Sequence, residues 1–140
     1  MVVEKMRRIL IVDDEIGARE SLRMILKNDY EVFLAKNAEE AFSQIKEHPP
    51  DAILLDIILP DLDGLKVLQR IKQNDPEMVV IMITATRTVK TGVEAMKLGA
   101  YDYLTKPFDI VRLRLLISRS LSSKDLEKEV KNRRKEMYGL

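Results

Sequence analysis

Short apolar runs alternate along this chain with segments whose apolar residues recur at helical spacing. Runs that are apolar throughout, rather than apolar at every second position, indicate strands that are covered on both faces. The five runs span residues 9–12, 32–35, 52–55, 78–83 and 101–104. Because strands and helices alternate five times, the pattern predicts an α/β fold with a parallel sheet and right-handed crossovers.

The segments between the runs predict five helices with apolar residues at i, i+3, i+4 or i+7. These stripes are Ala18 to Leu26, Ala38 to Ile45, Leu65 to Ile71, Val89 to Met96 and Leu113 to Ile117. Asn37 can cap the second helix with Glu40 three residues on, Pro49-Pro50 ends it, and Gly99 stops the fourth. We therefore expect a flavodoxin-like (βα)5 doubly wound parallel five-stranded sheet of order 2-1-3-4-5.

Composition excludes several classes of function. Cysteine is absent and histidine occurs once, so disulfide scaffolds, thiolate nucleophiles and zinc clusters are excluded. The net charge of +1 gives no argument for direct nucleic-acid binding, and no apolar run is long enough to cross a membrane. We expect a cytoplasmic protein, whose methionines, Met78, Met82 and Met96 among them, fill the core.

The composition changes after residue 121, where charged residues dominate. Glu127 with Lys131, and Glu129 with Arg133, form favourable i, i+4 pairs. We expect residues 6–121 to form the folded domain and residues 122–140 to extend the last helix into solvent.

Polar side chains gather where the predicted strands end. Asp13 and Asp14 follow the first strand, Asp56 the third and Thr84 the fourth, and Lys106 lies just past the fifth. In a doubly wound sheet, ligands bind beyond the carboxyl ends of the strands, where the winding direction switches. The five groups are therefore expected at one edge of the sheet.

This set of groups suits phosphoryl transfer. Three crowded carboxylates repel, so a proton or a cation must join them, and an oxygen-only set favours a hard cation such as Mg²⁺. Such a cation and the ammonium of Lys106 would balance a transferring phosphoryl group. Asp56 is then the available nucleophile and would form an aspartyl phosphate, with the Thr84 hydroxyl as a donor to the phosphoryl oxygens.

Four of these five residues also have a plain structural interpretation. Asp13 and Asp14 can be helix caps, Asp56 a turn residue and Lys106 a solvated loop lysine. The segment 61–64 resembles a fragment of a calcium loop, but it lacks the spaced ligands and is better explained as a turn into a helix. Separate loops would each have to place the right type of group at one sheet edge by chance, so their convergence there favours a functional site.

Four sequence landmarks resemble the receiver domain of bacterial two-component response regulators, over nearly all of residues 6 to 121. They are Ile9-Leu10-Ile11-Val12-Asp13-Asp14-Glu15, Leu54-Leu55-Asp56 with Pro60 and Asp63-Gly64, Ile83-Thr84-Ala85, and Tyr103-Leu104-Thr105-Lys106-Pro107-Phe108. The resemblance implies that residues 6–121 are a phosphoacceptor domain and 122–140 a helical linker.

The resemblance also assigns roles at the acidic edge. It implies that Asp56 accepts the phosphoryl group of a sensor histidine kinase. Asp13 and Asp14 would hold Mg²⁺ together with the Asp56 carboxylate and the backbone carbonyl of Ile58.

Further roles follow from the same resemblance. Thr84 and Lys106 would contact the phosphoryl group, and Tyr103 would be the aromatic switch residue that turns inward when the threonine moves. An ordinary half-buried aromatic at Tyr103 is the alternative. The Lys106-Pro107 bond is expected to be cis, as it usually is in the family.

One position departs from some family members. Ile58 is apolar where some carry a polar side chain near the attacking water, so we predict a long-lived aspartyl phosphate, which Thr86 could partly offset.

Two classes of function remain open at this stage. The first is a phosphorylation-driven switch that is not an enzyme on other substrates. The second is a Mg²⁺-dependent phosphatase with an aspartate nucleophile, which would need a cap or second acid that 140 residues barely provide. A persisting mass gain after incubation with a phosphodonor would identify the switch.

The output of such a switch is expected outside this chain, which has no GxxxxGK loop and no helix pair typical of DNA binding. The segment 127–140 is similar to the linker that joins receivers to the AAA+ ATPase in sigma-54-dependent (NtrC-like) transcription activators. An attached ATPase and DNA-binding domain are therefore expected beyond these residues.

A homodimer through the face formed by the fourth helix, the fifth strand and the fifth helix is one expectation, in which Leu126, Val130 and Met137 line the contact between two linker helices. A solvated linker helix is the alternative.

Overall fold

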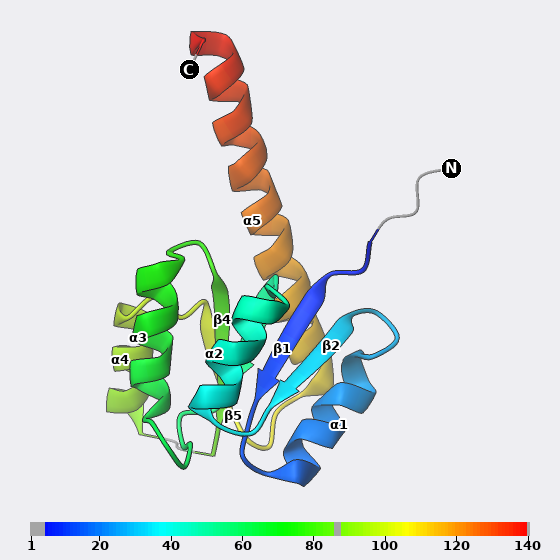
Figure 1. The fold of residues 1–140 in the computed structure, drawn as a ribbon, viewed down its shortest axis with the longest axis vertical. Helices are drawn as coiled ribbons and strands as arrows, with labels where there is room; N and C mark the ends of the chain where they lie inside the picture. Colours follow the sequence, from blue (N-terminus) through cyan, green and yellow to red (C-terminus); the bar gives the residue numbers. More distant parts are fainter. Residues whose placement is uncertain (1–4, 86–87, 140) are drawn as a thin grey trace. The chain divides into compact units, whose positions relative to one another are not determined.

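The computed structural model describes residues 5–85 and 88–139, which form five strands and five helices in strict alternation (Figure 1). The strands are β1 (Arg8–Val12), β2 (Glu31–Ala35), β3 (Ala52–Leu55), β4 (Val79–Thr84) and β5 (Asp102–Thr105). The helices are α1 (Ile16–Leu26), α2 (Ala38–Glu47), α3 (Gly64–Asn74), α4 (Val89–Lys97) and α5 (Ile110–Tyr138). The chain divides into two compact units, Met1–Phe108 and Asp109–Leu140, so the predicted boundary after residue 121 lies within α5 and stays a prediction.

The first unit holds a parallel sheet of order β2-β1-β3-β4-β5, which confirms the predicted flavodoxin-like topology. Val12, the last residue of β1, lies opposite both Ala35 and Leu55, so three strands end at the same level. Leu55 in turn lies opposite Met82, two residues before the end of β4. The register therefore aligns the carboxyl ends of the central strands, from which the candidate site residues project.

The core of the first unit lies between the sheet and helices α2, α3 and α4. Successive strand residues point to opposite faces, so every second residue of the central strands enters one buried cluster. The cluster contains Leu10 and Val12, Ile53 and Leu55, and Val80 and Met82 from the strands, with Ala38, Ala41, Val67, Leu68, Ile71 and Ala95 from the helices. The alternate residues of the same strands are equally buried, as expected for a sheet without a solvent face.

The predicted helix ends are confirmed. The side-chain oxygen of Asn37 accepts a hydrogen bond of 2.8 Å from the N–H of Glu40, and α2 ends at Glu47, before the two prolines. Gly99 follows α4 with a φ of 102°, a conformation that favours glycine.

The prediction that Met96 of α4 is a core residue is wrong. Val89, Val93 and Met96 are 82%, 48% and 47% exposed, and Ala95 is the buried residue of this helix. Met78 and Met82 are buried as expected, but Met96 is not a core residue. The helical spacing was a correct indication of a helix, but α4 packs through its small side chain and leaves its larger apolar side chains exposed.

The second unit consists mainly of α5, the extended helix that the sequence predicted. Asp109 caps it by accepting hydrogen bonds from the N–H groups of Val111 and Arg112. Its buried residues end at Leu121, and the predicted pair between Glu129 and Arg133 is present at 2.6 Å. Within residues 5–85 and 88–139, no helix combines the length and the apolar character needed to span a membrane.

Candidate functional site

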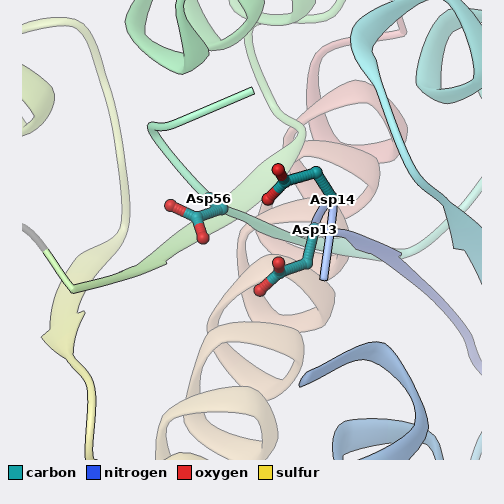
Figure 2. A group of neighbouring side chains, drawn as sticks. All are labelled: Asp13, Asp14 and Asp56. Atoms are coloured by element: carbon teal, nitrogen blue, oxygen red, sulfur yellow. The ribbon is translucent and has the colours of Figure 1, made fainter. Parts of the chain in front are cut away.

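Three aspartates converge at the carboxyl edge of the sheet (Figure 2). Asp13 directly follows β1 and its N–H donates to the carbonyl of Ala35, while Asp56 directly follows β3 and its N–H donates to the carbonyl of Val12. These backbone bonds continue the sheet by one residue and fix the two aspartates side by side. Carboxylate oxygens of Asp13, Asp14 and Asp56 all lie within 4.8 Å of one another, as the sequence predicted.

Lys106 joins this cluster from the segment after β5. Its ammonium lies 2.5 Å from a carboxylate oxygen of Asp13 and 3.0 Å from one of Asp56. Both aspartates are buried, at 2% and 6% exposure, so their charges need a partner. Burial alone would lower the pKa of Lys106, but its hydrogen bonds to Asp13 and Asp56 outweigh burial and raise that pKa. The lysine is therefore a firmly held cation.

Asp14 differs from its two neighbours because it is exposed. Neither Asp13 nor Asp14 is the N-cap residue of α1, which was the alternative interpretation of this pair. Glu15 is that N-cap residue, and its side chain makes no capping hydrogen bond. Asp13 accepts a bond of 3.0 Å from the N–H of Glu15 with one oxygen, while its other oxygen contacts Lys106.

The Asp56 carboxylate is held through both oxygens. One accepts a bond of 3.1 Å from the N–H of Ile58, and the other contacts Lys106. Ile58 is 58% exposed, and its side chain offers no polar group beside Asp56. Thr86, which was predicted to offset in part the missing polar group of Ile58, lies outside the described residues.

Thr84 and Tyr103 lie on neighbouring strands. Thr84 is fully buried at the end of β4, and its carbonyl accepts a bond of 2.8 Å from the N–H of Lys106. Tyr103 is half-buried in β5 and packs against the core cluster. Burial, and then the charge of Asp56, raise the pKa of the Tyr103 phenol. The Lys106-Pro107 peptide bond is cis, as expected.

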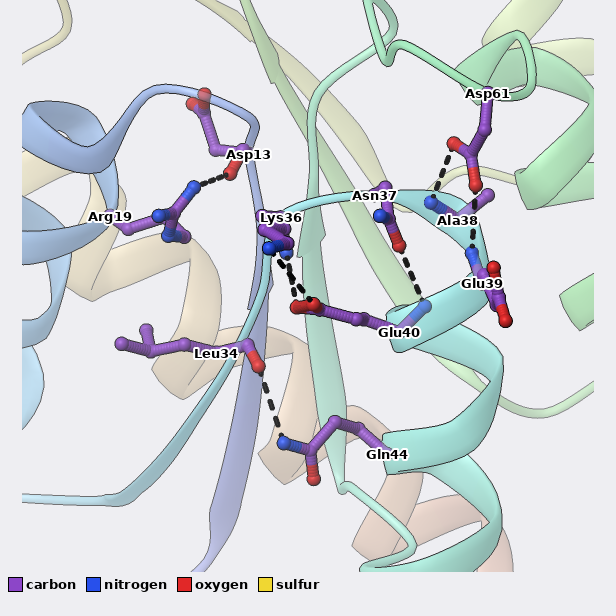
Figure 3. A network of polar contacts seen from close by, with 10 residues as sticks. All are labelled: Asp13, Arg19, Leu34, Lys36, Asn37, Ala38, Glu39, Glu40, Gln44 and Asp61. Atoms are coloured by element: carbon purple, nitrogen blue, oxygen red, sulfur yellow. Dashed lines mark hydrogen bonds and ion pairs between the residues drawn. The ribbon is translucent and has the colours of Figure 1, made fainter.

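Sequence reasoning missed a contact that holds the loop after β1. The guanidinium of Arg19 donates a bond of 2.7 Å to the backbone carbonyl of Asp13 (Figure 3). Arg19 lies in the first turns of α1, six residues after Asp13, so a basic residue at that distance from an acidic pair was the available signal.

A second missed contact holds the loop after β3. The segment 61–64 was interpreted only as a turn into a helix, and Asp63 does cap α3. Asp61, however, accepts hydrogen bonds from the N–H groups of Ala38 and Glu39 at the start of α2. No spacing pattern in the sequence indicates this contact, because it joins residues more than twenty positions apart.

The ligand set fits a hard divalent cation. The groups that converge are carboxylates, of which Asp13 and Asp56 are buried and Asp14 is exposed to solvent. Mg²⁺ prefers oxygen ligands and retains several waters, so it suits a site with one wet side.

Comparison with known proteins gives a family for the chain. The family model of the response regulator receiver domain matches residues 9–118. The regulatory protein AtoC of Escherichia coli (strain K12) is 37% identical over 126 residues, which cover 89% of this chain and 27% of that protein. The response regulator MprA of Mycobacterium avium (strain 104) is 39% identical over 125 residues, covering 86% of this chain and 55% of that protein. The chain thus spans about a quarter to about a half of these relatives.

Solved structures agree. A CheY-like response regulator receiver domain protein from Methanospirillum hungatei JF-1 superposes with a TM-score of 0.84 at 32% identity, covering 88% of this chain and 99% of that one. NtrX from Brucella abortus superposes with a TM-score of 0.87 at 38% identity, covering 94% of this chain and 30% of NtrX. The fold, the acidic edge with its lysine, and these matches together show that the chain belongs to the family of response regulator receiver domains.

Proposed function

We propose that Asp56 accepts a phosphoryl group from a sensor histidine kinase and that the modified chain switches an attached effector. The observation that carries this proposal is the group of three carboxylates within 4.8 Å, with the ammonium of Lys106 between Asp13 and Asp56. Asp13, Asp14, the Asp56 carboxylate and the backbone carbonyl of Ile58 would hold Mg²⁺. When bound, Mg²⁺ would neutralise negative charge on the phosphoryl oxygens.

In the proposed transfer, a carboxylate oxygen of Asp56 attacks the phosphorus of the kinase's phosphohistidine. A P–O bond forms as the P–N bond breaks, and the electron pair of that bond returns to the imidazole, which takes a proton from solvent. Lys106 would supply a positive charge close to the new phosphoryl group, and Thr84 would donate its hydroxyl to a phosphoryl oxygen.

The signal would leave the site through Thr84 and Tyr103. The phenol of Tyr103 lies near enough to Asp56 for the carboxylate charge to affect its pKa. The same residue lines a groove of about 570 Å³ between α4 and β5, whose walls include Val93 and Met96. A turn of the Tyr103 ring would therefore reshape an exposed apolar surface of the first unit.

The proposed effector is that of a sigma-54-dependent transcription activator. NtrX from Brucella abortus has been solved with ADP and with ATP, while the match to this chain covers 30% and 29% of it. The rest of a protein of that size leaves room for a nucleotide-binding part. We infer that an AAA+ ATPase and a DNA-binding domain accompany this receiver in the full protein.

Incubation with acetyl phosphate and Mg²⁺, followed by mass spectrometry of the intact chain, tests the proposal. We expect the mass of one added phosphoryl group to persist, and to be absent in Asp56→Asn. Asp63→Asn is the matched control, because it removes an exposed carboxylate from the same loop and should still be modified. Steady release of phosphate without a persisting adduct would favour the phosphatase instead.

Ile58 is expected to affect how long the phosphoryl group stays on Asp56. Because its apolar side chain cannot orient a water molecule, we expect slow hydrolysis, and faster loss of phosphate in Ile58→Asn. A wild type that loses phosphate faster than this variant would contradict the assignment.

The proposed homodimer rests on exposed apolar groups. Val93 and Met96 of α4 are exposed, and so, within α5, are Leu126, Val130 and Met137. Sedimentation of the chain with and without residues 124–140 at several concentrations tests it. Identical monomers in both would refute the dimer.

A further inference from the structure

The loop after β3 is tied at its far end to the start of helix α2. One carboxylate oxygen of Asp61 accepts a bond of 2.9 Å from the N–H of Ala38, and the other accepts a bond of 3.0 Å from the N–H of Glu39 (Figure 3). Both N–H groups belong to the first turn of α2, where backbone donors lack partners within the helix. Asp61 thus satisfies them with a side chain from a distant loop.

The first turn of α2 also has its own local cap. Asn37 accepts from the N–H of Glu40, and the side chain of Glu40 accepts from the N–H of Lys36. Asp61 is therefore an addition to a helix end that is already capped. Hydrogen bonds from Ala38, and then from Glu39, lower the pKa of the Asp61 carboxyl despite partial desolvation, so it stays ionised at neutral pH.

The near end of the same loop belongs to the phosphoacceptor. The N–H of Asp56 donates to Val12 of β1, and the N–H of Ile58 donates to the Asp56 carboxylate. Segment 56–61 is thus fastened to the sheet at one end and to α2 at the other. The Ile58 carbonyl, a proposed Mg²⁺ ligand, lies between these two fixed points.

Asp63 gives a contrast within the same loop. Its carboxylate accepts a bond of 2.9 Å from the N–H of Leu65, two residues on, so it caps the helix to which it is joined. Such a contact stabilises α3 but connects no other element. Asp61 is the one of the two whose bonds restrain segment 56–61.

We propose that Asp61 is a positioning residue for the metal site, holding segment 56–61 so that the Asp56 carboxylate and the Ile58 carbonyl stay ready to bind Mg²⁺. The inference rests on the proposed function. The N–H of Gly64 also donates a bond of 2.7 Å to the carbonyl of Ile57, so the tether acts on residues 58–61. Without it these residues would have to be ordered when the ion binds, and the entropy lost in ordering them would oppose binding. Groups that orient metal ligands affect metal affinity for this reason.

Calorimetric titration with Mg²⁺ of wild type, Asp61→Asn, Asp61→Ala and Asp63→Asn tests the proposal. We expect the dissociation constant for Mg²⁺ to rise about tenfold in Asp61→Ala, the size typical for loss of an orienting group. Asp61→Asn keeps one acceptor oxygen and should fall between wild type and alanine. Asp63→Asn, which removes a similar charge, should change the constant by less than about twofold.

A kinetic measurement separates positioning from a general loss of stability. In the acetyl phosphate reaction, Asp61→Asn should need more Mg²⁺ for half-maximal rate and reach the same plateau as wild type. A lower melting temperature with unchanged Mg²⁺ affinity in both Asp61 variants would show that Asp61 merely caps α2, and would overturn the proposal. Failure of the wild type itself to bind Mg²⁺ would refute the proposed function as well, and is seen before any variant is made.

Discussion

Two ion pairs with similar geometry lie in two different regions of this chain. At the sheet edge, the Lys106 ammonium lies 3.0 Å from Asp56, and within α5 the Arg133 guanidinium lies 2.6 Å from Glu129. The side chain of Asp56 is 7% exposed, whereas those of Arg133 and Glu129 are 76% and 55% exposed. Charges in water gain little by pairing, whereas a buried charge depends on its partner. Burial, and not distance, therefore distinguishes the ion pair at the sheet edge from the ion pair in α5.

The largest effect we expect at the sheet edge comes from Gly64→Ala. A Cβ at this position would lie 2.8 Å from the carbonyl oxygen of Ile57 and closer still to the backbone of Asp56. Backbone atoms of Asp56 and Ile57 would have to move, so we expect a loss of roughly 3 kcal/mol in the free energy of unfolding. Urea-induced unfolding measures the stability, and acetyl phosphate labelling measures the site.

Gly17→Ala is the matched control in helix α1. A Cβ there meets nothing within 4 Å, so alanine should stabilise the chain by about 0.5 to 1 kcal/mol through helix propensity. If both substitutions lower stability equally, the close packing of Gly64 under Asp56 does not have the importance that we give it.

The next effect distinguishes the two ion pairs directly. Lys106→Met removes the cation that Asp13 and Asp56 share, and in the absence of Mg²⁺ we expect a loss of about 2 kcal/mol in the free energy of unfolding. Mg²⁺ should recover part of that loss, because it supplies positive charge to the same carboxylates. Unfolding curves with and without Mg²⁺ give both numbers.

Arg133→Met is the control for the exposed pair in α5. It should change the free energy of unfolding by no more than about 0.5 kcal/mol, with or without Mg²⁺. A loss as large as that of Lys106→Met would mean that residues around Arg133 are covered in solution.

The sheet edge was predictable because it follows from order along the chain. Asp13 and Asp56 each come directly after an apolar run, and parallel strands in register bring such positions together. Lys106 was placed by the same rule. The place of a charged residue that directly follows a strand is therefore predictable once the order of the strands is known.

Other features depend on packing that no periodicity encodes. The spacing of Val93 and Met96 predicted a helix but not which of its sides is covered, and both are exposed. The bonds from Asp61 to α2 join loops that only the folded sheet brings together. Helical spacing of apolar residues predicts that a helix forms. Which residues each of its side chains contacts is decided only by the tertiary fold.

A smaller effect concerns pH. The N–H groups of Ala38 and Glu39 lower the pKa of Asp61 from the ordinary value of 3.8, so its ionised form favours the folded state. That contribution is complete above 3.8 and is lost as the pH falls through the lowered value. The stability difference between wild type and Asp61→Asn should therefore be constant near neutral pH and shrink in acid. A difference that grows in acid would contradict the assignment.

The smallest effect lies in the exposed part of α5 and sharpens the comparison from the other side. Val130 is 41% exposed, whereas Val67 in α3 is fully buried. In a monomer, Val130→Ala should stay within about 0.5 kcal/mol of wild type and gain slightly from helix propensity, while Val67→Ala should cost about 2 kcal/mol. If α5 pairs with a second copy, however, Val130→Ala loses buried contact and its cost grows with protein concentration. Unfolding at two concentrations therefore decides whether residues 122–138 behave as solvated surface or as an interface.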